Sequence, residues 1–539
     1  MASELEWTPP GPGTWTLAAD HYPRPITATH RAFLPIWSEA STSIMGDLPI
    51  DGVRMEAVNG FPYMTVLGDS PGKVPPPWVM AIMARLVPSL RRSERRLREW
   101  MRDRPWIDGV DEWHRTLRPA AVARLRALAV VDVGGLDEAG LADHLLAVRA
   151  EWATDARLHI SLGRHDMLPT CVFVAGLVDD GVEVSTAMSL LAGSSPVSGG
   201  ESPELDRLRG VLGGDVLERV DAAGLAPELD EALQEYLTMH AWRLVDGYDV
   251  DGPCLIENED LMLRRINTPS LPARAASSSL ESEVRAALPR ERAATFDTDL
   301  AEARACYGLR DDNGHILISW STGLLRRAML QAGATLAAGG SLEDPTLAIE
   351  ATPEELADAL RSVAPIDEAG LRERRRRRSN LRAADAPEHL GGAPSPAPAG
   401  LPGALGKVMR AFDIAELGAD PPEEPLTGFG IGSGRYEGKA RLVLGAGEGL
   451  DRFEPGDVLV TPMTSPSYNG LLAIAGALVC DTGGVLSHAA VMARELALPS
   501  VIGTGDATRR IDDGARVAVD TERGTVTVLA PAEREPAPS

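Results

Sequence analysis

The chain has few cysteines, no excess of basic residues and no long apolar run, and each absence excludes a class of protein. Its four cysteines among 539 residues are dispersed without metal-binding or redox spacing, which indicates a reducing compartment and no metal site. The formal net charge of -25 argues against a nucleic-acid partner, because phosphate backbones repel such a surface unless a basic patch is segregated on it. No signal peptide or apolar run of spanning length is visible, so we expect a cytoplasmic protein without a membrane partner.

The chain is longer than one hydrophobic core usually serves, and its composition changes sharply once. Residues 383–423 begin with a run rich in alanine, proline and glycine that cannot form a packed element, so a linker and connecting segment is predicted there. It separates a large region, 1–382, from a smaller one, 424–531, which is followed by a disordered tail, 532–539. The expected class is a multidomain α plus α/β protein.

The region before the linker is mostly helical by pattern. Its segments carry apolar residues at three- and four-residue spacing, with arginine and glutamate on the other faces. Asn59-Gly60 lies between alternating apolar residues and predicts a β-hairpin over 55–64. A helical bundle domain with a short hairpin is therefore expected. The predicted helices are 78–101, 137–159, 204–220, 227–244, 280–307, 322–338 and 353–376.

In the smaller region, His488 follows a diglycine turn and opens an alanine-rich segment. Apolar residues 476–480 predict a strand that ends before Gly483-Gly484, and the residues after Ser487 are good helix formers that Ser487 can cap. His488 is thus expected in the first turn of a helix, where free backbone N–H groups and the helix dipole favour an anion. Its imidazole could accept a phosphoryl group there and release it again, although an isolated histidine more often only packs or hydrogen-bonds.

The run from Gly483 to Glu495 resembles the phosphohistidine, or swivelling, domain of phosphoenolpyruvate-utilising enzymes. The family pattern G-G-x-x-S-H-A-A-x-x-A-R-E is present at every fixed position, and the resemblance extends over roughly 424–531. It implies a C-terminal α/β domain in which His488 is transiently phosphorylated. The residues expected to bind the phosphoryl group are Gly483, Gly484, Ser487, Arg494 and Thr464, the last in a strand and turn typical of the family.

The N-terminal region resembles the substrate-binding domain of the rifampin phosphotransferase family, on less specific motifs at 11–15, 58–60 and 322–327. Ionisable groups concentrate beside aromatic rings at the end of the fourth predicted helix and directly after it, over residues 239–251. His240 or one of the nearby aspartates is the candidate base and Arg243 a candidate phosphate clamp, as transfer to an acceptor requires. A helix C-terminus followed by an acidic turn explains the same residues equally well. Candidate substrate-binding residues are Asp246, Asp249, Arg310 and Arg326.

Two other charged segments have simpler interpretations. Arg310 and His315 flank an Asp-Asp-Asn-Gly sequence, which is a strong turn signal, so the turn interpretation is favoured there. The basic run 374–378 continues a helical segment with acidic residues nearby and is interpreted as a solvated helix end.

No segment resembles the ATP-grasp domain that loads the histidine in relatives. The resemblance therefore implies a phosphotransferase component that is incomplete without a separate ATP-grasp subunit, which binds ATP and Mg²⁺ while this chain binds neither directly. His488 would take the β-phosphoryl group of ATP and pass it to a hydroxylated, hydrophobic or aromatic small molecule in the helical region. Two alternatives remain open: a phosphocarrier or regulatory protein that docks a protein partner, and an enzyme that uses phosphorylation to activate a leaving group in secondary metabolism.

Overall fold

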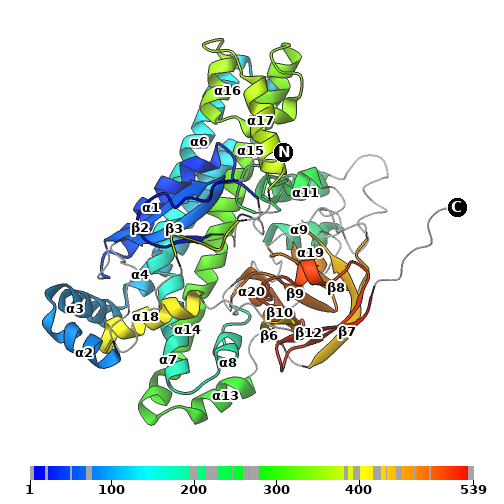
Figure 1. The fold of residues 1–539 in the computed structure, drawn as a ribbon. Helices are drawn as coiled ribbons and strands as arrows, with labels where there is room; N and C mark the ends of the chain where they lie inside the picture. The colour runs from blue at the N-terminus through cyan, green and yellow to red at the C-terminus, as the bar shows by residue number, and fades with distance from the viewer. Residues whose placement is uncertain are drawn as a thin grey trace. The chain divides into compact units, whose positions relative to one another are not determined.

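The computed structural model divides the chain into two compact units, each built from segments that are distant in sequence (Figure 1). Unit 1 combines Met1–His165, Thr238–Cys254 and Asn313–Met409, and unit 2 combines Asp166–Leu237, Leu255–Asp312 and Arg410–Ser539. The predicted tail 532–539 lies outside the described residues. The structure describes residues 5–18, 22, 24–48, 51–67, 76–194, 203–212, 227–245, 247–258, 262, 266, 278–381, 386–392, 401–416, 426–432, 434–444, 452–464, 468–484 and 487–531.

The predicted mixture of helical and sheet structure is confirmed, but the layout differs from the predicted boundaries. Helical segments from before the linker belong to the same unit as the C-terminal sheet. The physical reason is a shared hydrophobic core: Phe173 and Leu300 of these helices are clustered with Ala411 and Val491 of the C-terminal part.

Two elements lie inside the predicted linker, namely β4 (His389–Leu390) and α18 (Gly403–Glu416). β4 pairs with β1 (Trp15–Leu17), and Leu390 is buried in a cluster with Trp15. For residues 389–390 the prediction that no packed element forms is therefore wrong. A single apolar side chain and a few backbone hydrogen bonds suffice to add a short strand to an existing sheet.

The sheet of unit 1 confirms the predicted hairpin. Its strand order is β2-β3-β1-β4, and β2 (Gly52–Val58) pairs antiparallel with β3 (Phe61–Leu67). Asn59 has φ 51° and Gly60 has φ 88°, the two positive angles that a type I′ turn requires.

Helices form most of the rest of unit 1. The predicted helices 137–159 and 322–338 are confirmed as α6 (Glu138–Ser161) and α15 (Ser321–Ala338). They pack together, and Trp152 of α6 donates from Nε1 to Oγ1 of Thr322 at 3.0 Å. Further helices are α1 (Phe33–Ile44), α4 (Pro105–Glu112), α5 (Arg118–Ala129) and the 3-10 helix η8 (Pro345–Glu350).

Other predicted helices are interrupted, twice at proline. The predicted helix 78–101 is α2 (Pro77–Leu86) and α3 (Pro88–Asp103), because Val87 before Pro88 is extended. A similar break at Pro289 separates α13 (Ser278–Ala287) from α14 (Arg290–Asn313). The predicted helix 353–376 is α16 (Pro353–Leu360) and α17 (Glu368–Ser379). The predicted helices 204–220 and 227–244 are seen as α9 (Pro203–Leu212) and α11 (Pro227–His240), and 213–220 lies outside the described residues.

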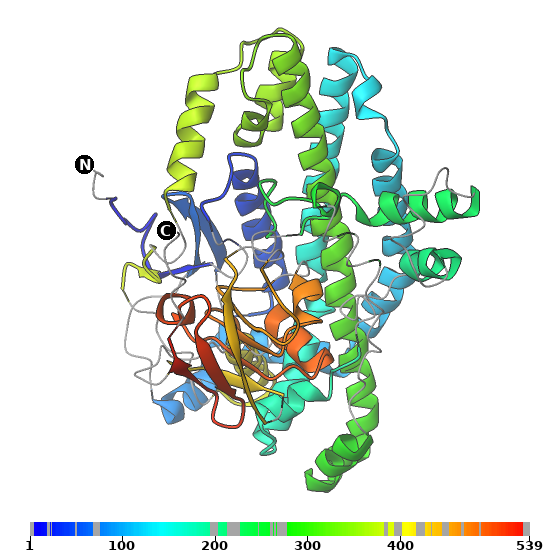
Figure 2. The ribbon, with the colours of Figure 1, turned by 90° about the vertical axis from the view of Figure 1, so that its right-hand side faces the viewer.

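The favoured turn around Asn313 is wrong, because the chain stays helical there. α14 continues through a π-helix, η7 (Gly314–Trp320), directly into α15 (Figure 2). The side chain of Asn313 contacts the ring of His159, and η7 is almost wholly buried. A turn would leave backbone groups of this buried segment without partners, whereas the helix pairs them internally.

Unit 2 contains an eight-stranded sheet in the order β5-β12-β11-β7-β8-β9-β10-β6. The strands β7, β8, β9 and β10 are parallel neighbours, so the carboxyl ends of β8 and β9 meet at one edge. The predicted strand 476–480 is confirmed as β9. The strands are β5 (Leu426–Thr427), β6 (Phe429–Ile431), β7 (Arg435–Leu442), β8 (Val458–Thr461), β9 (Ala477–Cys480), β10 (Ser500–Ile502), β11 (Arg516–Asp520) and β12 (Thr525–Ala530). The helices of this unit also include α7 (Met167–Asp179), α8 (Val184–Ser189) and α20 (His488–Glu495).

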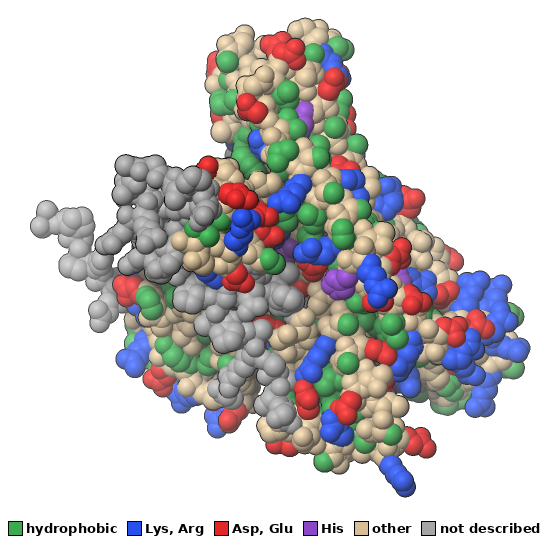
Figure 3. All heavy atoms as spheres, turned by 180° about the vertical axis from the view of Figure 1, so that it is seen from behind, with side chains coloured by type: hydrophobic (Ala, Val, Ile, Leu, Met, Phe, Trp, Pro, Cys, Tyr) green, Lys and Arg blue, Asp and Glu red, His purple; other side chains and the backbone are tan. Residues whose placement is uncertain are grey.

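One face of unit 1 departs from the negative charge of the chain. Blue side chains gather at the right-hand edge of Figure 3, over α2 and α3. Arg91, Arg92 and Arg95 of α3 are exposed, and so is Arg85 at the end of α2. Net charge alone therefore does not exclude an anionic partner at this face.

Gly323→Ala is expected to lower the free energy of unfolding by about 2–3 kcal/mol, because an added Cβ would overlap the carbonyl oxygen of Trp242. Gly210→Ala in α9 is the control, since no atom lies within 4 Å of an added Cβ there; it should change stability by no more than about 1 kcal/mol. Urea denaturation of both variants measures the difference. Equal effects would contradict the close approach of α15 to residue 242.

Candidate functional site

The turn that precedes His488 starts at the carboxyl ends of β8 and β9. Thr482 donates to the carbonyl oxygen of Pro462 from its backbone N–H and from its hydroxyl, each at 2.9 Å, which ties the two strand ends together. Gly483 has φ 117°, and an added Cβ would lie 2.8 Å from Oγ of Ser487. This position thus requires glycine for both backbone angle and space.

His488 is the first residue of α20, as predicted. Ser487 is the N-cap, with φ -66° and ψ 158°, and its side chain accepts from the backbone N–H of Ala490 at 3.3 Å. The imidazole Nδ1 lies 2.9 Å from Oγ1 of Thr464, which follows β8. This hydrogen bond fixes the ring at the helix N-terminus, where backbone N–H groups and the helix dipole favour an anion.

Four of the five predicted phosphoryl-binding residues lie in this turn region: Gly483, Gly484, Ser487 and Thr464. Arg494 stands six residues after His488, which on an α-helix is about 9 Å along the axis and on a different face. It is buried, and desolvation lowers its pKa to about 10 while the nearby Tyr307 of α14 opposes that shift.

One residue of this edge was not singled out from the sequence. Asp481 follows β9, accepts from the backbone N–H of Thr508 at 2.9 Å and also contacts the Thr508 hydroxyl. Burial raises its pKa, although these hydrogen bonds oppose the shift. Its position directly after a buried strand is the signal that could have identified it, since carboxyl ends of parallel strands line sites.

The candidates His240 and Arg243 lie in unit 1 at the end of α11. His240 is its last residue and is buried. The guanidinium of Arg243 lies 5.9 Å from the ring centroid of Trp320, and its Nε donates to the carbonyl oxygen of Met239 at 2.8 Å. Arg243 thus packs on an aromatic ring, His240 is enclosed by the protein, and Asp246 lies outside the described residues.

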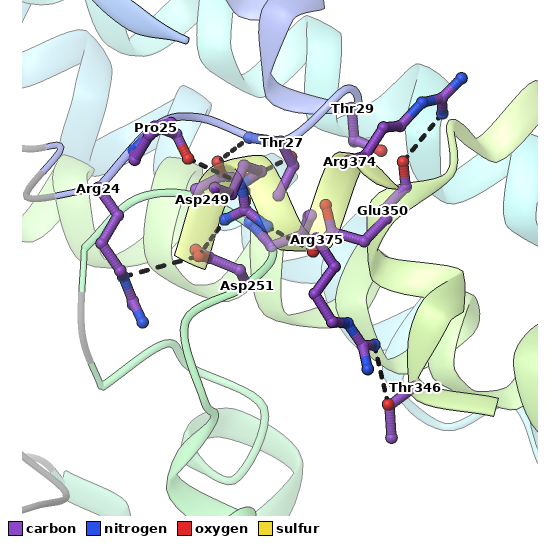
Figure 4. A network of polar contacts seen from close by, with 12 residues as sticks. Arg24, Pro25, Thr27, Thr29, Asp249, Asp251, Thr346, Glu350, Arg374 and Arg375 are labelled. Carbon is purple, nitrogen blue, oxygen red and sulfur yellow. Dashed lines mark hydrogen bonds and ion pairs between the residues drawn. The ribbon is translucent and has the colours of Figure 1, made fainter. Parts of the chain in front are cut away.

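Asp249 is the most enclosed of the predicted substrate-binding residues of unit 1. It accepts from the backbone N–H and the hydroxyl of Thr27, each at 2.6 Å, and from the N–H of Val250 at 2.6 Å (Figure 4). Burial raises its pKa despite these bonds and the charge of His30. Arg326 reaches the same segment, donating from Nη1 to the carbonyl oxygen of Val250 at 2.7 Å.

The basic run of α17 borders this network and is not a solvated helix end throughout. Arg378 is largely enclosed: it pairs with Asp251, with Glu350 at 2.7 Å, and with the carbonyl oxygen of Pro25 at 2.8 Å. Arg375 pairs with Asp344 at 2.8 Å. The interpretation is wrong for Arg375 and Arg378, because carboxylates from two other segments, at Asp251 and around η8, converge on these arginines. A local sequence pattern cannot reveal such contacts.

Arg310 is set apart from the other substrate-binding candidates. It lies in the last turn of α14 in unit 2, where its charge helps to lower the pKa of Cys171 and Tyr307 against the larger effect of burial. The candidates therefore form two groups, one in each unit.

The described residues contain no cluster of three or more His, Cys, Asp or Glu side chains that could hold a metal ion. None of the helices described is long and apolar enough to span a bilayer.

Comparison with known proteins confirms the resemblance found in the sequence. Residues 453–524 match the family described as PEP-utilising enzyme, mobile domain. A rifampicin phosphotransferase from Streptomyces sp is 27% identical over 408 residues, which is 72% of this chain and 44% of that protein. Another from Streptomyces sviceus is 28% identical over 344 residues, 60% of this chain and 37% of that protein. The phosphoenolpyruvate synthase of Aeropyrum pernix is 42% identical over 119 residues, 21% of this chain and 14% of the synthase. This chain thus spans less than half the length of the two phosphotransferases.

Thr27→Val is expected to lower the free energy of unfolding by about 2 kcal/mol, because buried Asp249 would lose a hydroxyl donor that valine cannot replace. Thr346→Val is the matched control: Thr346 makes the same two bonds to Asp344, at 2.9 and 2.6 Å, on an exposed surface. It should cost less than about 0.5 kcal/mol. Urea unfolding followed by circular dichroism measures both losses of unfolding free energy. Equal losses in the two variants would contradict the idea that burial makes the Thr27 contact the more stabilising one.

Proposed function

We propose that this chain is a phosphotransferase component in which His488 carries the phosphoryl group, because residues 453–524 match the PEP-utilising enzyme, mobile domain family. The observation that supports the proposal most directly is the hydrogen bond between Thr464 and Nδ1 of His488 at the first residue of α20. It combines a nucleophilic imidazole with a helix N-terminus suited to an anion.

The proposed nucleophile is Nε2 of His488. When Nδ1–H donates to Oγ1 of Thr464, the Nε2 lone pair is the one available for attack on phosphorus. The P–N bond forms as the bond from phosphorus to the donor oxygen breaks, and the departing oxygen keeps the electron pair. The N–H groups near Gly483 and Gly484 and the Ser487 hydroxyl would then stabilise the phosphoryl oxygens.

We assign the donor to ATP, bound with Mg²⁺ by a separate ATP-grasp subunit. Attack of Nε2 on the β-phosphorus would release AMP and leave the β- and γ-phosphoryl groups on the imidazole. Water would then take the γ-phosphoryl group as phosphate, which leaves the β-phosphoryl group on His488. This assignment follows from the family resemblance. In the second step an acceptor hydroxyl attacks the phosphorus, the P–N bond breaks, and a base takes the hydroxyl proton.

The acceptor is proposed to be a hydroxylated, hydrophobic or aromatic small molecule bound by the helical part of the chain. His240 is the proposed base and Arg243 a proposed clamp, with Asp249, Arg310 and Arg326 as further binding residues. The rifampicin phosphotransferases among the relatives are consistent with such an acceptor. A phosphocarrier that docks a protein, or an enzyme that activates a leaving group, are the competing functions.

His488→Ala is expected to abolish labelling of the chain when ATP, Mg²⁺ and a candidate ATP-grasp partner are supplied. Mass spectrometry of the peptide that contains residue 488 should show an acid-labile phosphoryl adduct in the wild-type chain and none in the His488→Ala variant. His389→Ala is the control variant, because His389 lies in β4 and should leave labelling unchanged. Labelling of the isolated wild-type chain by ATP would contradict the division of work between two subunits.

Thr464→Val is expected to slow phosphorylation of His488 about fivefold, since loss of one hydrogen bond of about 1 kcal/mol frees the ring and its tautomer. Thr464→Ser should keep the wild-type rate because it retains the hydroxyl. Phosphoramidate, a small-molecule donor to histidine, allows both rates to be measured without the partner. Equal rates in the valine and serine variants would refute the role of Thr464.

A further inference from the structure

The face of α20 that carries His488 is packed against helices of its own unit. Residues 488, 491 and 495 share one face, because they are three, four and seven positions apart on a helix with 3.6 residues per turn. Val491, in the middle of this face, packs on a core formed mainly by α7, α8, α13 and α14. The catalytic histidine and the docking contacts therefore occupy the same side of the helix.

Glu495 closes this face with a polar contact. Its Oε1 accepts from the backbone N–H of Gly193, after α8, at 2.7 Å, and the side chain is only 4% exposed. No hydrogen-bond partner for the other carboxyl oxygen, Oε2, is found in the part of the chain that the structure describes. A carboxyl that accepts one bond and is otherwise desolvated fits the neutral acid better than the anion.

The surroundings of Glu495 also disfavour its charge. Burial raises its pKa to about 7, the bond from Gly193 opposes the shift, and the negative charge of Asp311 on α14 adds to it. Burial raises the pKa of Tyr307 of α14 well above its ordinary value, and the positive charge of Arg494, on the same helix as Glu495, opposes that shift. Among the described residues, Asp311 of α14 acts on Glu495, and Arg310 of α14 and Arg494 of α20 act on the neighbouring Tyr307.

We propose that Glu495 is a positioning residue: in its protonated form it holds the histidine-bearing face of α20 on α14 and the Gly193 turn, and its ionisation releases that face. The contact between Glu495 and Gly193 does not depend on catalysis, but a role for its release rests on the proposed function of His488. A phosphohistidine that is loaded and discharged at different places must leave each docking surface reversibly.

The direction of the pH effect follows from the two protonation states. Undocked and hydrated, Glu495 should titrate near its ordinary 4.5; docked, it titrates at about 7. Docking is therefore strongest below the lower value and weakens as the pH rises through the upper one. Between pH 6 and pH 8 the docking constant should fall about tenfold.

Amide hydrogen exchange of the full-length chain tests this proposal through the peptide that contains Gly193. After correction for intrinsic exchange, we expect the Gly193 amide to exchange about tenfold faster at pH 8 than at pH 6 in the wild-type chain. Glu495→Gln keeps the acceptor oxygen without the charge and should be protected equally at both values. Glu495→Ala should exchange fast at both.

Two controls separate this proposal from the proposed function. Glu437→Gln removes an exposed carboxylate on β7 and should retain the wild-type pH response. His488→Ala should also retain the wild-type pH response, since docking requires no phosphorylation. Glu495→Gln should still be labelled by phosphoramidate. A wild-type chain without pH dependence, or a Glu495→Gln variant with the full wild-type dependence, would overturn the proposal.

Discussion

The hydrogen bond between Thr464 and His488 is the contact on which the site depends, because it joins the end of one strand to the start of the helix after the next. β8 and β9 deliver the two residues to one edge of the sheet, and Gly483 permits the tight return of the chain. Without the parallel pairing of these strands, the ring would have neither a fixed orientation nor a helix N-terminus behind it.

The two ends of α20 have opposite electrostatic requirements. At its N-terminus, backbone N–H groups and the Ser487 cap favour added negative charge. At its C-terminus, burial disfavours charge on both Arg494 and Glu495. One short helix can therefore bind an anion at one end while its other end is held by contacts that weaken on ionisation.

Local patterns predicted what depends on neighbours in sequence. Three predicted features are of this kind: the Asn59-Gly60 hairpin, the strand before the diglycine turn and the helix that begins at His488. Each depends on the backbone preferences or the capping side chain of a few neighbouring residues. The helix breaks at Pro88 and Pro289 had equally local signals. By contrast, the turn favoured at Asn313 fails because burial against His159 outweighs a local turn preference.

The sequence did not predict which charged and polar side chains pair across long stretches of chain. Arg378 meets Asp251 and Glu350, and Asp249 meets Thr27, across long stretches of chain, so that no spacing in the sequence links them. The same limit applies to α20: its motif identifies the histidine, yet the contact of Glu495 with Gly193 joins residues about three hundred positions apart. A short motif can thus identify a chemically active residue such as His488, whereas the surface against which its helix packs is known only from the three-dimensional fold.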